Sequence, residues 1–114
     1  MLYKKSLREP WFTLIKLGIK KYEGRLYVDI WKDIKIGDTI IFTNKDIGER
    51  VITVKIKSIQ IFKSLIDMFN TIDIIYILPG FNNIDDGYNL YHKYYTKDDE
   101  KKYGMVLYEI EIIE

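Results

Sequence analysis

Residues 10–25 read PWFTLIKLGIKKYEGR, and this stretch predicts a short helix followed by a charged turn that leads into a strand. Pro10 suits the first turn of a helix, where its missing N–H would have no partner. The apolar positions that follow have helical spacing: Trp11, Leu14, Ile15 and Leu17. Gly18 is typical of a helix end, so the helix is expected to stop between residues 18 and 20.

The charged turn contains Lys20, Glu23 and Arg25, a combination typical of a ligand site. Arg25 offers a planar set of donors for a phosphate or a base carbonyl, and Glu23 can accept from an amine or a hydroxyl. Lys20 could neutralise a phosphate, or act as a nucleophile or base if burial lowered its pKa. The alternative is a cluster of surface ion pairs, each contributing about 0 to 1 kcal/mol.

Downstream of this turn the sequence predicts strands and short helices in irregular order. Alternating apolar and β-branched residues predict strands at 25–30, 39–42, 51–61 and 106–112, the third with a β-bulge near Lys57 or Ser58. A turn at 35–38 and a hairpin loop at 44–49 separate the first three strands. Helices are expected at 62–69 and 83–96, and a solvated loop at 96–104. The β-branched run at 71–80 would also suit a strand, but a helix is expected there because of its length and its position before LPG. This pattern indicates an α+β fold built on a small, mostly antiparallel β-barrel.

Tyrosines crowd the last predicted helix, at positions 88, 91, 94 and 95. Aromatic residues at helical spacing usually belong to a core, but four in eight residues exceed what one small core can bury. An exposed ring beside a basic turn can stack on an unpaired base, at roughly 1 to 3 kcal/mol per base. Tyr91 and Tyr95 are the preferred candidates, whereas His92 is expected to be a solvated helix residue.

Length and composition restrict the class of protein. The 114 residues fit one domain, 1–114, with one core. There is no cysteine and one histidine, so no metal and no cofactor is expected. No apolar run reaches the roughly 18 residues of a membrane span, and no signal peptide is recognisable, which predicts a cytoplasmic protein without a membrane partner. At a net charge of +1, nucleic-acid affinity would need a local basic rim, for which the candidates are Lys4, Lys5, Arg8, Lys20 and Lys21.

A series of short motifs runs through the chain in a recognisable order: PWFxxIxxG, KxxExR, IxxGDxIxF, LPG, YxxYY and GxVxYxIxI. Together they resemble the ASCH domain family of the PUA-like superfamily, from Pro10 to Ile112. The resemblance implies a compact β-barrel decorated with helices. Its cleft would lie between the first helix, the KxxExR segment and the tyrosine-rich helix.

PUA-like domains commonly bind RNA or modified bases, so the resemblance implies a nucleic-acid partner. Some small ASCH proteins resemble hydrolases of N4-acetylcytidine that use a lysine, a threonine and a glutamate, and ribonuclease activity has been attributed to others. Lys20, Arg25 and Tyr95 match the family's lysine, arginine and tyrosine. Glu23 stands where the hydrolases have threonine, and their glutamate has no clear counterpart among Asn82, Asn83, Asp85 and Asp86.

Three functions remain open on this basis. The leading hypothesis is a domain that recognises RNA, other single-stranded nucleic acid or a modified nucleoside in a basic cleft, with these ligand-binding residues: Trp11, Lys20, Glu23, Arg25, Tyr91 and Tyr95. The rival is a metal-independent hydrolase of a modified nucleoside or of RNA, with Lys20 as the activated group and Glu23 as acid or base. The third is a protein-interaction module, for which an exposed apolar patch away from the cleft would speak.

Overall fold

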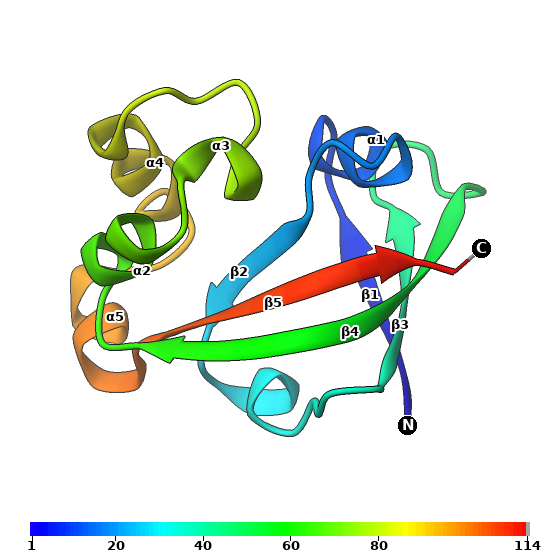
Figure 1. Cartoon of the computed structure of the whole chain (residues 1–114), viewed down its shortest axis with the longest axis horizontal. Helices are drawn as coiled ribbons and strands as arrows, with labels where there is room; N and C mark the ends of the chain where they lie inside the picture. Colours follow the sequence, from blue (N-terminus) through cyan, green and yellow to red (C-terminus); the bar gives the residue numbers. More distant parts are fainter. Residues whose placement is uncertain (114) are drawn as a thin grey trace.

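One five-stranded sheet organises the chain (Figure 1), which is described here from a computed structural model for residues 1–113. Its strands are β1 (Leu2–Leu7), β2 (Tyr22–Leu26), β3 (Thr39–Asn44), β4 (Val51–Phe62) and β5 (Met105–Ile112). They lie in the order β1-β3-β4-β5-β2. The β1–β3 pairing is parallel, and the other three are antiparallel. The edge strands β1 and β2 line one common cavity, so the sheet is curled into a half-barrel.

Short helices flank this half-barrel: α1 (Trp11–Lys16), α2 (Leu65–Thr71), α3 (Ile74–Ile77), α4 (Ile84–Tyr91) and α5 (Lys97–Tyr103). A 3-10 turn spans Asp29–Lys32. Figure 1 shows α2 to α5 gathered on one side of the molecule and α1 apart from them on the other. None of the helices described is long and apolar enough to cross a bilayer. The architecture confirms the predicted α+β fold with a mostly antiparallel, barrel-like sheet and short helices, and the sheet is curled into a half-barrel.

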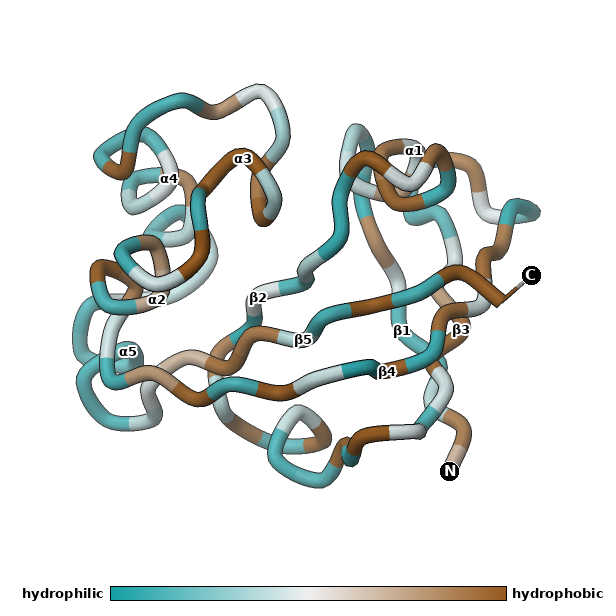
Figure 2. Tube along the Cα trace, in the orientation of Figure 1, coloured by the Kyte–Doolittle hydropathy of each residue, from teal (hydrophilic) through white to brown (hydrophobic). Residues whose placement is uncertain are grey.

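Two clusters of buried side chains hold the elements together, and β5 belongs to both. Val106, Tyr108 and Ile110 point into the half-barrel, where they pack with residues such as Phe42 and Val54. The alternate residues Met105 and Leu107 pack against α2, α3 and α4 in the second cluster. Along the neighbouring strand β4, Figure 2 shows hydrophobic residues alternating with hydrophilic ones. Because successive strand residues face opposite sides, one strand joins the barrel core to the helical core.

The predicted strand at 25–30 was wrong in its bounds. β2 begins at Tyr22 and ends at Leu26, since this is the stretch that pairs with β5. The chain then leaves the sheet and forms the 3-10 turn that buries Trp31. The first strand of the chain, β1, was not predicted. Its residues LYKKSL carry two lysines, and it is held by parallel pairing with β3, which is not visible in the local pattern.

The predicted solvated loop at 96–104 was also wrong, because α5 occupies this segment. The Thr96 hydroxyl caps the helix by accepting from the Asp99 N–H. Acidic residues in its first turn and lysines in its last suit the helix dipole. Glu100 is buried within it. The charge run is therefore a helix with one polar residue turned inward.

Other local predictions were confirmed or needed smaller corrections. β3, the loop after it and the helical character of α3 agree with the prediction, and the bulge of β4 lies between Ile56 and Ser58. The bulge turns Ile59 back towards the barrel core but leaves Ile61 exposed. In α1, Phe12 and Ile15 are the buried residues, while Leu17 is exposed. The tyrosine-rich helix ends earlier than predicted, at Tyr91.

Candidate functional site

A cavity of about 320 Å³ opens where the two edge strands of the half-barrel approach each other. All six candidate residues predicted from the sequence line it. Elements distant in the chain contribute the complete lining: Ser6, Leu7, Arg8, Trp11, Lys20, Glu23, Gly24, Arg25, Lys45, Leu78, Leu90, Tyr91, Tyr94 and Tyr95. The charged turn and the aromatic residues are thus brought to one concave site.

Local backbone structure explains how the charged residues converge. Gly18 has a φ of +76°, a left-handed conformation that favours glycine and ends α1. The N–H groups of Ile19 and Lys20 then both donate to the Leu14 carbonyl, which turns the chain back towards the sheet. Glu23 and Arg25 follow two residues apart in β2 and therefore share one face of the strand.

Glu23 lies between the two cations. Its Oε1 is 3.3 Å from the Lys20 Nζ, and its Oε2 accepts from the Arg25 Nε at 2.8 Å and lies 2.7 Å from Nη2. The side chains of Lys20, Glu23 and Arg25 are only 1%, 7% and 20% exposed. The alternative of a surface ion-pair cluster therefore does not fit. Two cations and one carboxylate leave this buried triad with a formal charge of +1.

The Lys20 ammonium is fully engaged by protein acceptors. Besides Glu23, it donates to the Tyr22 carbonyl at 2.7 Å and to the Ile77 carbonyl. An ammonium has three donors, and all three are used. In this arrangement Lys20 ties β2 to α3 and supports Glu23, and it has no donor left for a phosphate.

Burial and mutual attraction shift the pKa values of the triad. Burial lowers the pKa of Lys20, and the nearby Glu23 carboxylate opposes this only in part. Burial by itself would raise the pKa of Glu23, but Arg25 and Lys20 outweigh it and hold that pKa below its usual value. Burial likewise disfavours the Arg25 cation, yet Glu23 more than compensates and raises its pKa. Glu23 is therefore a carboxylate at neutral pH.

Aromatic rings form the walls of the cavity. The Trp11 ring lies 5.5 Å from the Lys20 Nζ and packs against Phe81 at 6.0 Å. The rings of Tyr91 and Tyr95 are stacked, with centroids 6.3 Å apart and an interplanar angle of 19°. The planar Arg25 guanidinium in turn lies over the ring of Trp31 at 4.6 Å. Arg25 is thereby held in place by a ring on one side and a carboxylate on the other.

The tyrosines of the lining differ in how accessible their side chains are. Tyr91 is buried, its hydroxyl donates to the Gly24 carbonyl at 3.4 Å, and burial raises its pKa well above the usual value. Burial also raises the pKa of Tyr95, with the Arg25 charge opposing it, and its ring is partly accessible. Tyr94, which was not a candidate, is 62% exposed at the same cavity.

Two further cations line the cavity: Arg8, which the sequence suggested only as part of a basic rim, and Lys45, which was not predicted. Arg8 directly follows β1 and Lys45 directly follows β3, and their meeting depends on the parallel pairing of Leu7 with Asn44. Of the basic rim expected from the sequence, only Arg8 and the buried Lys20 line this cavity. Lys21 lines a second, smaller cavity, together with Lys20 and with residues of α1, β4 and β5.

His92 is not the solvated residue that was predicted. Its Nε2 lies 2.7 Å from the Glu100 Oε1, and both side chains are largely buried. The other carboxylate oxygen of Glu100 accepts from the N–H of Leu65, the first residue of α2. His92 therefore joins α4 to α5 and α2, and it does not line the cavity of about 320 Å³.

Comparisons with known proteins agree with this architecture. The model of the ASCH domain family matches residues 6–114. The crystal structure of hypothetical protein PH0355 is 41% identical in sequence, covers 99% of this chain and 100% of its own, and has a TM-score of 0.89. The solution NMR structure of protein PF0455 from Pyrococcus furiosus is 36% identical, covers 100% and 99%, and has a TM-score of 0.81.

A third solved structure carries the family's description. The ASCH domain from Lactobacillus crispatus JV V101 has a TM-score of 0.65 over 96% of this chain and 79% of its own. At 13% identity this likeness concerns the fold alone. No curated protein matches the sequence. With a family match that extends over nearly the whole chain, the protein belongs to the ASCH domain family.

Proposed function

We propose that this protein binds RNA, or a modified nucleoside, by taking a single nucleobase into the cavity beside Arg25. The observation that carries the proposal is the buried triad of Lys20, Glu23 and Arg25 in the wall of a cavity of about 320 Å³ with aromatic sides. Small-ligand sites have volumes of roughly 300 to 1,000 Å³. The cavity is at the lower end of that range, which suits one base or nucleoside.

The unused hydrogen-bonding groups of the triad suit the edge of a base. Glu23 uses about three of its four acceptor positions on Lys20 and Arg25, which leaves one at Oε1. Arg25 retains its Nη1 group, which Glu23 does not engage. On a base with a carbonyl next to a ring N–H, as in uracil or guanine, the carbonyl would accept from Arg25 and the N–H would donate to Glu23. Trp11 and Tyr95 would cover the faces of the ring.

The geometry favours binding over hydrolysis. To act as a nucleophile, the Lys20 ammonium would have to lose a proton and give up one of its contacts with Glu23, Tyr22 and Ile77, and its side chain is only 1% exposed. The pKa of Glu23 is held below its usual value by Arg25 and Lys20, so this carboxylate is a poor proton donor at neutral pH. A recognition site needs neither change.

Binding is tested with a short, fluorescein-labelled single-stranded RNA of mixed sequence, by fluorescence anisotropy. The variants Arg25→Gln and Tyr95→Ala are expected to lose most of the affinity of the wild-type protein. Matched controls are Lys35→Gln and Tyr76→Ala, which remove an exposed cation and a half-exposed ring that do not line the cavity. Circular dichroism of each variant verifies that it folds. Equal affinity of all four variants would refute the assignment to this cavity.

Two further measurements separate the possible ligands from the possible reaction. Native mass spectrometry of the purified protein, with unmodified and N4-acetylated nucleosides added one at a time, detects a free nucleoside in the site. Incubation with N4-acetylcytidine and with RNA, followed by product analysis, tests hydrolysis. Turnover of either substrate that is abolished in Lys20→Met would favour the hydrolase. Failure of the wild-type protein to bind any RNA or nucleoside would refute the proposed function.

A further inference from the structure

The four cations that line the cavity form two groups that differ in burial and pairing. Lys20 and Arg25 are buried and share Glu23. Arg8 and Lys45 are exposed, and within residues 1–113 neither has a carboxylate within ion-pair distance. The two buried charges are thus largely compensated by Glu23. The two exposed charges, Arg8 and Lys45, are not, and we call this exposed part of the lining the mouth of the cavity.

A network of hydrogen bonds holds the backbone at these two outer cations. The Lys45 N–H donates to the Leu7 carbonyl at 2.8 Å, next to Arg8 in the chain. The Glu9 N–H donates to the Asp46 carboxylate at 2.9 Å, and the buried Asn44 amide donates to Glu9 at 3.0 Å. Arg8 therefore lies between Leu7 and Glu9, and Lys45 between Asn44 and Asp46, and hydrogen bonds join the two segments on both sides of these cations. The pair occupies a fixed place at the cavity while its side chains stay free.

The segment after α4 adds an exposed aromatic ring to the lining. Tyr94 follows α4, and its N–H donates to the Tyr91 carbonyl at 3.0 Å, so its backbone is ordered. Its side chain is largely exposed although the neighbouring Tyr95 is mostly covered. The wall formed after α4 thus carries one ring within the cavity and one at its margin.

We infer that the ligand of this site is a nucleotide within a single strand and not a free nucleoside, an inference that rests on the function proposed above. Arg8 and Lys45 bind the phosphates that flank the inserted base, because they are the uncompensated cations at the mouth. Tyr94 stacks on the neighbouring base of the same strand, which remains outside the cavity. In this arrangement Glu23 and Arg25 hydrogen-bond to the inserted base, and Arg8 and Lys45 bind the phosphate backbone.

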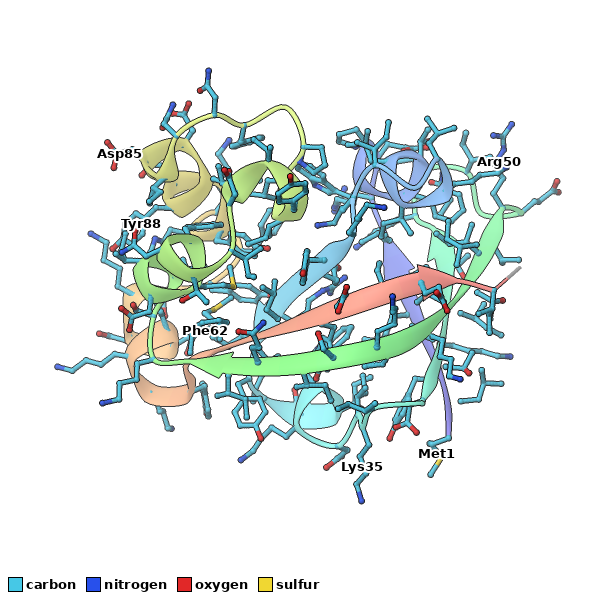
Figure 3. The ribbon with its side chains drawn as sticks, in the orientation of Figure 1. Met1, Lys35, Arg50, Phe62, Asp85 and Tyr88 are labelled. Atoms are coloured by element: carbon cyan, nitrogen blue, oxygen red, sulfur yellow. The ribbon has the colours of Figure 1, made fainter. Side chains whose placement is uncertain are left out.

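The phosphate contacts are tested through the salt dependence of RNA binding. The probe is the same labelled single-stranded RNA, titrated with the wild-type protein and with the double variant Arg8→Gln/Lys45→Gln between about 50 and 200 mM salt. Each lost contact to a single strand is expected to reduce the slope of log K against log salt by about 0.7. The control is Lys35→Gln/Lys101→Gln, two exposed lysines outside the lining. Figure 3 shows Lys35 at the end of the molecule opposite α1.

The stacking contact is tested at constant salt. Tyr94→Ala is expected to weaken RNA binding roughly five- to 150-fold, the equivalent of about 1 to 3 kcal/mol for one stacked base. Tyr94→Phe keeps the ring and is expected to retain wild-type affinity. Because Tyr94 is exposed, neither change should affect folding.

The outcomes separate this inference from the function on which it rests. If the mouth variants keep the affinity and salt slope of the wild type while Arg25→Gln loses binding, the inference is wrong and the proposed function stands. A free nucleoside bound as tightly as the RNA that contains it would also overturn the inference. If the wild-type protein binds neither probe, the proposed function fails first, and the inference falls with it.

Discussion

Glu23 is the residue on which the charged site depends, because it faces two cations that have lost most of their contact with water. Breaking a buried ion pair by removing one partner leaves an uncompensated charge and typically costs about 3 to 5 kcal/mol. Here the partner removed would be shared by Lys20 and Arg25. The same carboxylate is also the proposed acceptor for a base, so its structural and recognition roles coincide.

Glu23→Gln is expected to lower the free energy of unfolding by about 3 to 5 kcal/mol, since it leaves Lys20 and Arg25 without a counter-charge. Urea unfolding at neutral pH measures the change. The control is Glu111→Gln, which removes a 54% exposed carboxylate 3.9 Å from Lys57 and should cost less than about 1 kcal/mol. Similar losses in the two variants would contradict the role given to burial.

The contribution of Glu23 is also expected to depend on pH. Its pKa in the folded protein lies below the ordinary value of 4.5. As the pH falls, Glu23 therefore takes up a proton in the unfolded chain before it does so in the folded protein. The stability that the carboxylate contributes is fully present above its ordinary pKa, and it is lost as the pH falls through the lower pKa of the folded protein. The difference in unfolding free energy between the wild type and Glu23→Gln should be largest at neutral pH and narrow in acid. A constant difference would show that the charge is not responsible.

Gly24 separates Glu23 from Arg25, and its position requires the absence of a side chain. A Cβ there would lie 2.6 Å from the Tyr91 hydroxyl and 3.3 Å from the Met68 Cε. Gly24→Ala is therefore expected to cost about 1 to 3 kcal/mol in urea unfolding. Gly48→Ala, where nothing lies within 4 Å, is the control. The loss should shrink in a Tyr91→Phe background, because that change removes the clashing oxygen; an undiminished loss would argue against this contact.

Among the elements, α5 shows how a charged segment becomes part of the structure. Its buried Glu100 accepts from the Leu65 N–H at 2.7 Å, at the start of α2, and contacts His92 at the end of α4. One carboxylate thus joins three helices. The N-terminal N–H groups of a helix have no partner within it, so Glu100 caps α2 from another element.

Glu100→Ala is expected to destabilise the protein by about 1 to 3 kcal/mol, because it leaves the buried Leu65 N–H without an acceptor. Thermal unfolding followed by circular dichroism measures this. Asp98→Ala removes an exposed carboxylate from the first turn of the same helix and should cost below about 1 kcal/mol. If Asp98 proved the more important of the two, the helix dipole would outweigh the bridge between helices.

For the whole molecule, the shared strand β5 predicts that the two cores unfold together. Its alternate residues enter the barrel core and the helical core, as Val106 and Leu107 do. Neither cluster can lose β5 without the other losing it too. The cavity also depends on this coupling, because it is lined from both the half-barrel and the helical side.

Leu107→Ala tests this coupling, because it removes apolar contacts only from the helical core. We expect a loss of about 2 to 5 kcal/mol. In a Trp11→Phe background, the fluorescence of Trp31 in the barrel core should report the same lowered urea midpoint as circular dichroism. The exposed Ile61→Ala serves as control. A Trp31 transition that stayed at the wild-type midpoint would mean that the barrel unfolds independently.

Much of the fold was accessible from local patterns. α1, β3, the bulge of β4 and the alternation of β5 depend on residues a few positions apart, and the spacing of apolar side chains predicted them. The nearness of Glu23 and Arg25 has the same origin, since alternate residues of a strand share a face. α5 also had a local signal, the Thr96 cap, which was outweighed by its run of charges.

The sequence by itself thus determined the class of fold, most of its elements and six of the charged and aromatic residues that line the cavity. Tertiary structure alone decided the pairing of β1 with β3, the bounds of β2, and the presence of Lys45 and Tyr94 at the cavity. It also decided that Lys20 is buried with its donors used. The physical reason is that strand pairing, burial and hydrogen-bond saturation depend on groups far apart in the chain, whereas periodicity and capping depend on neighbours.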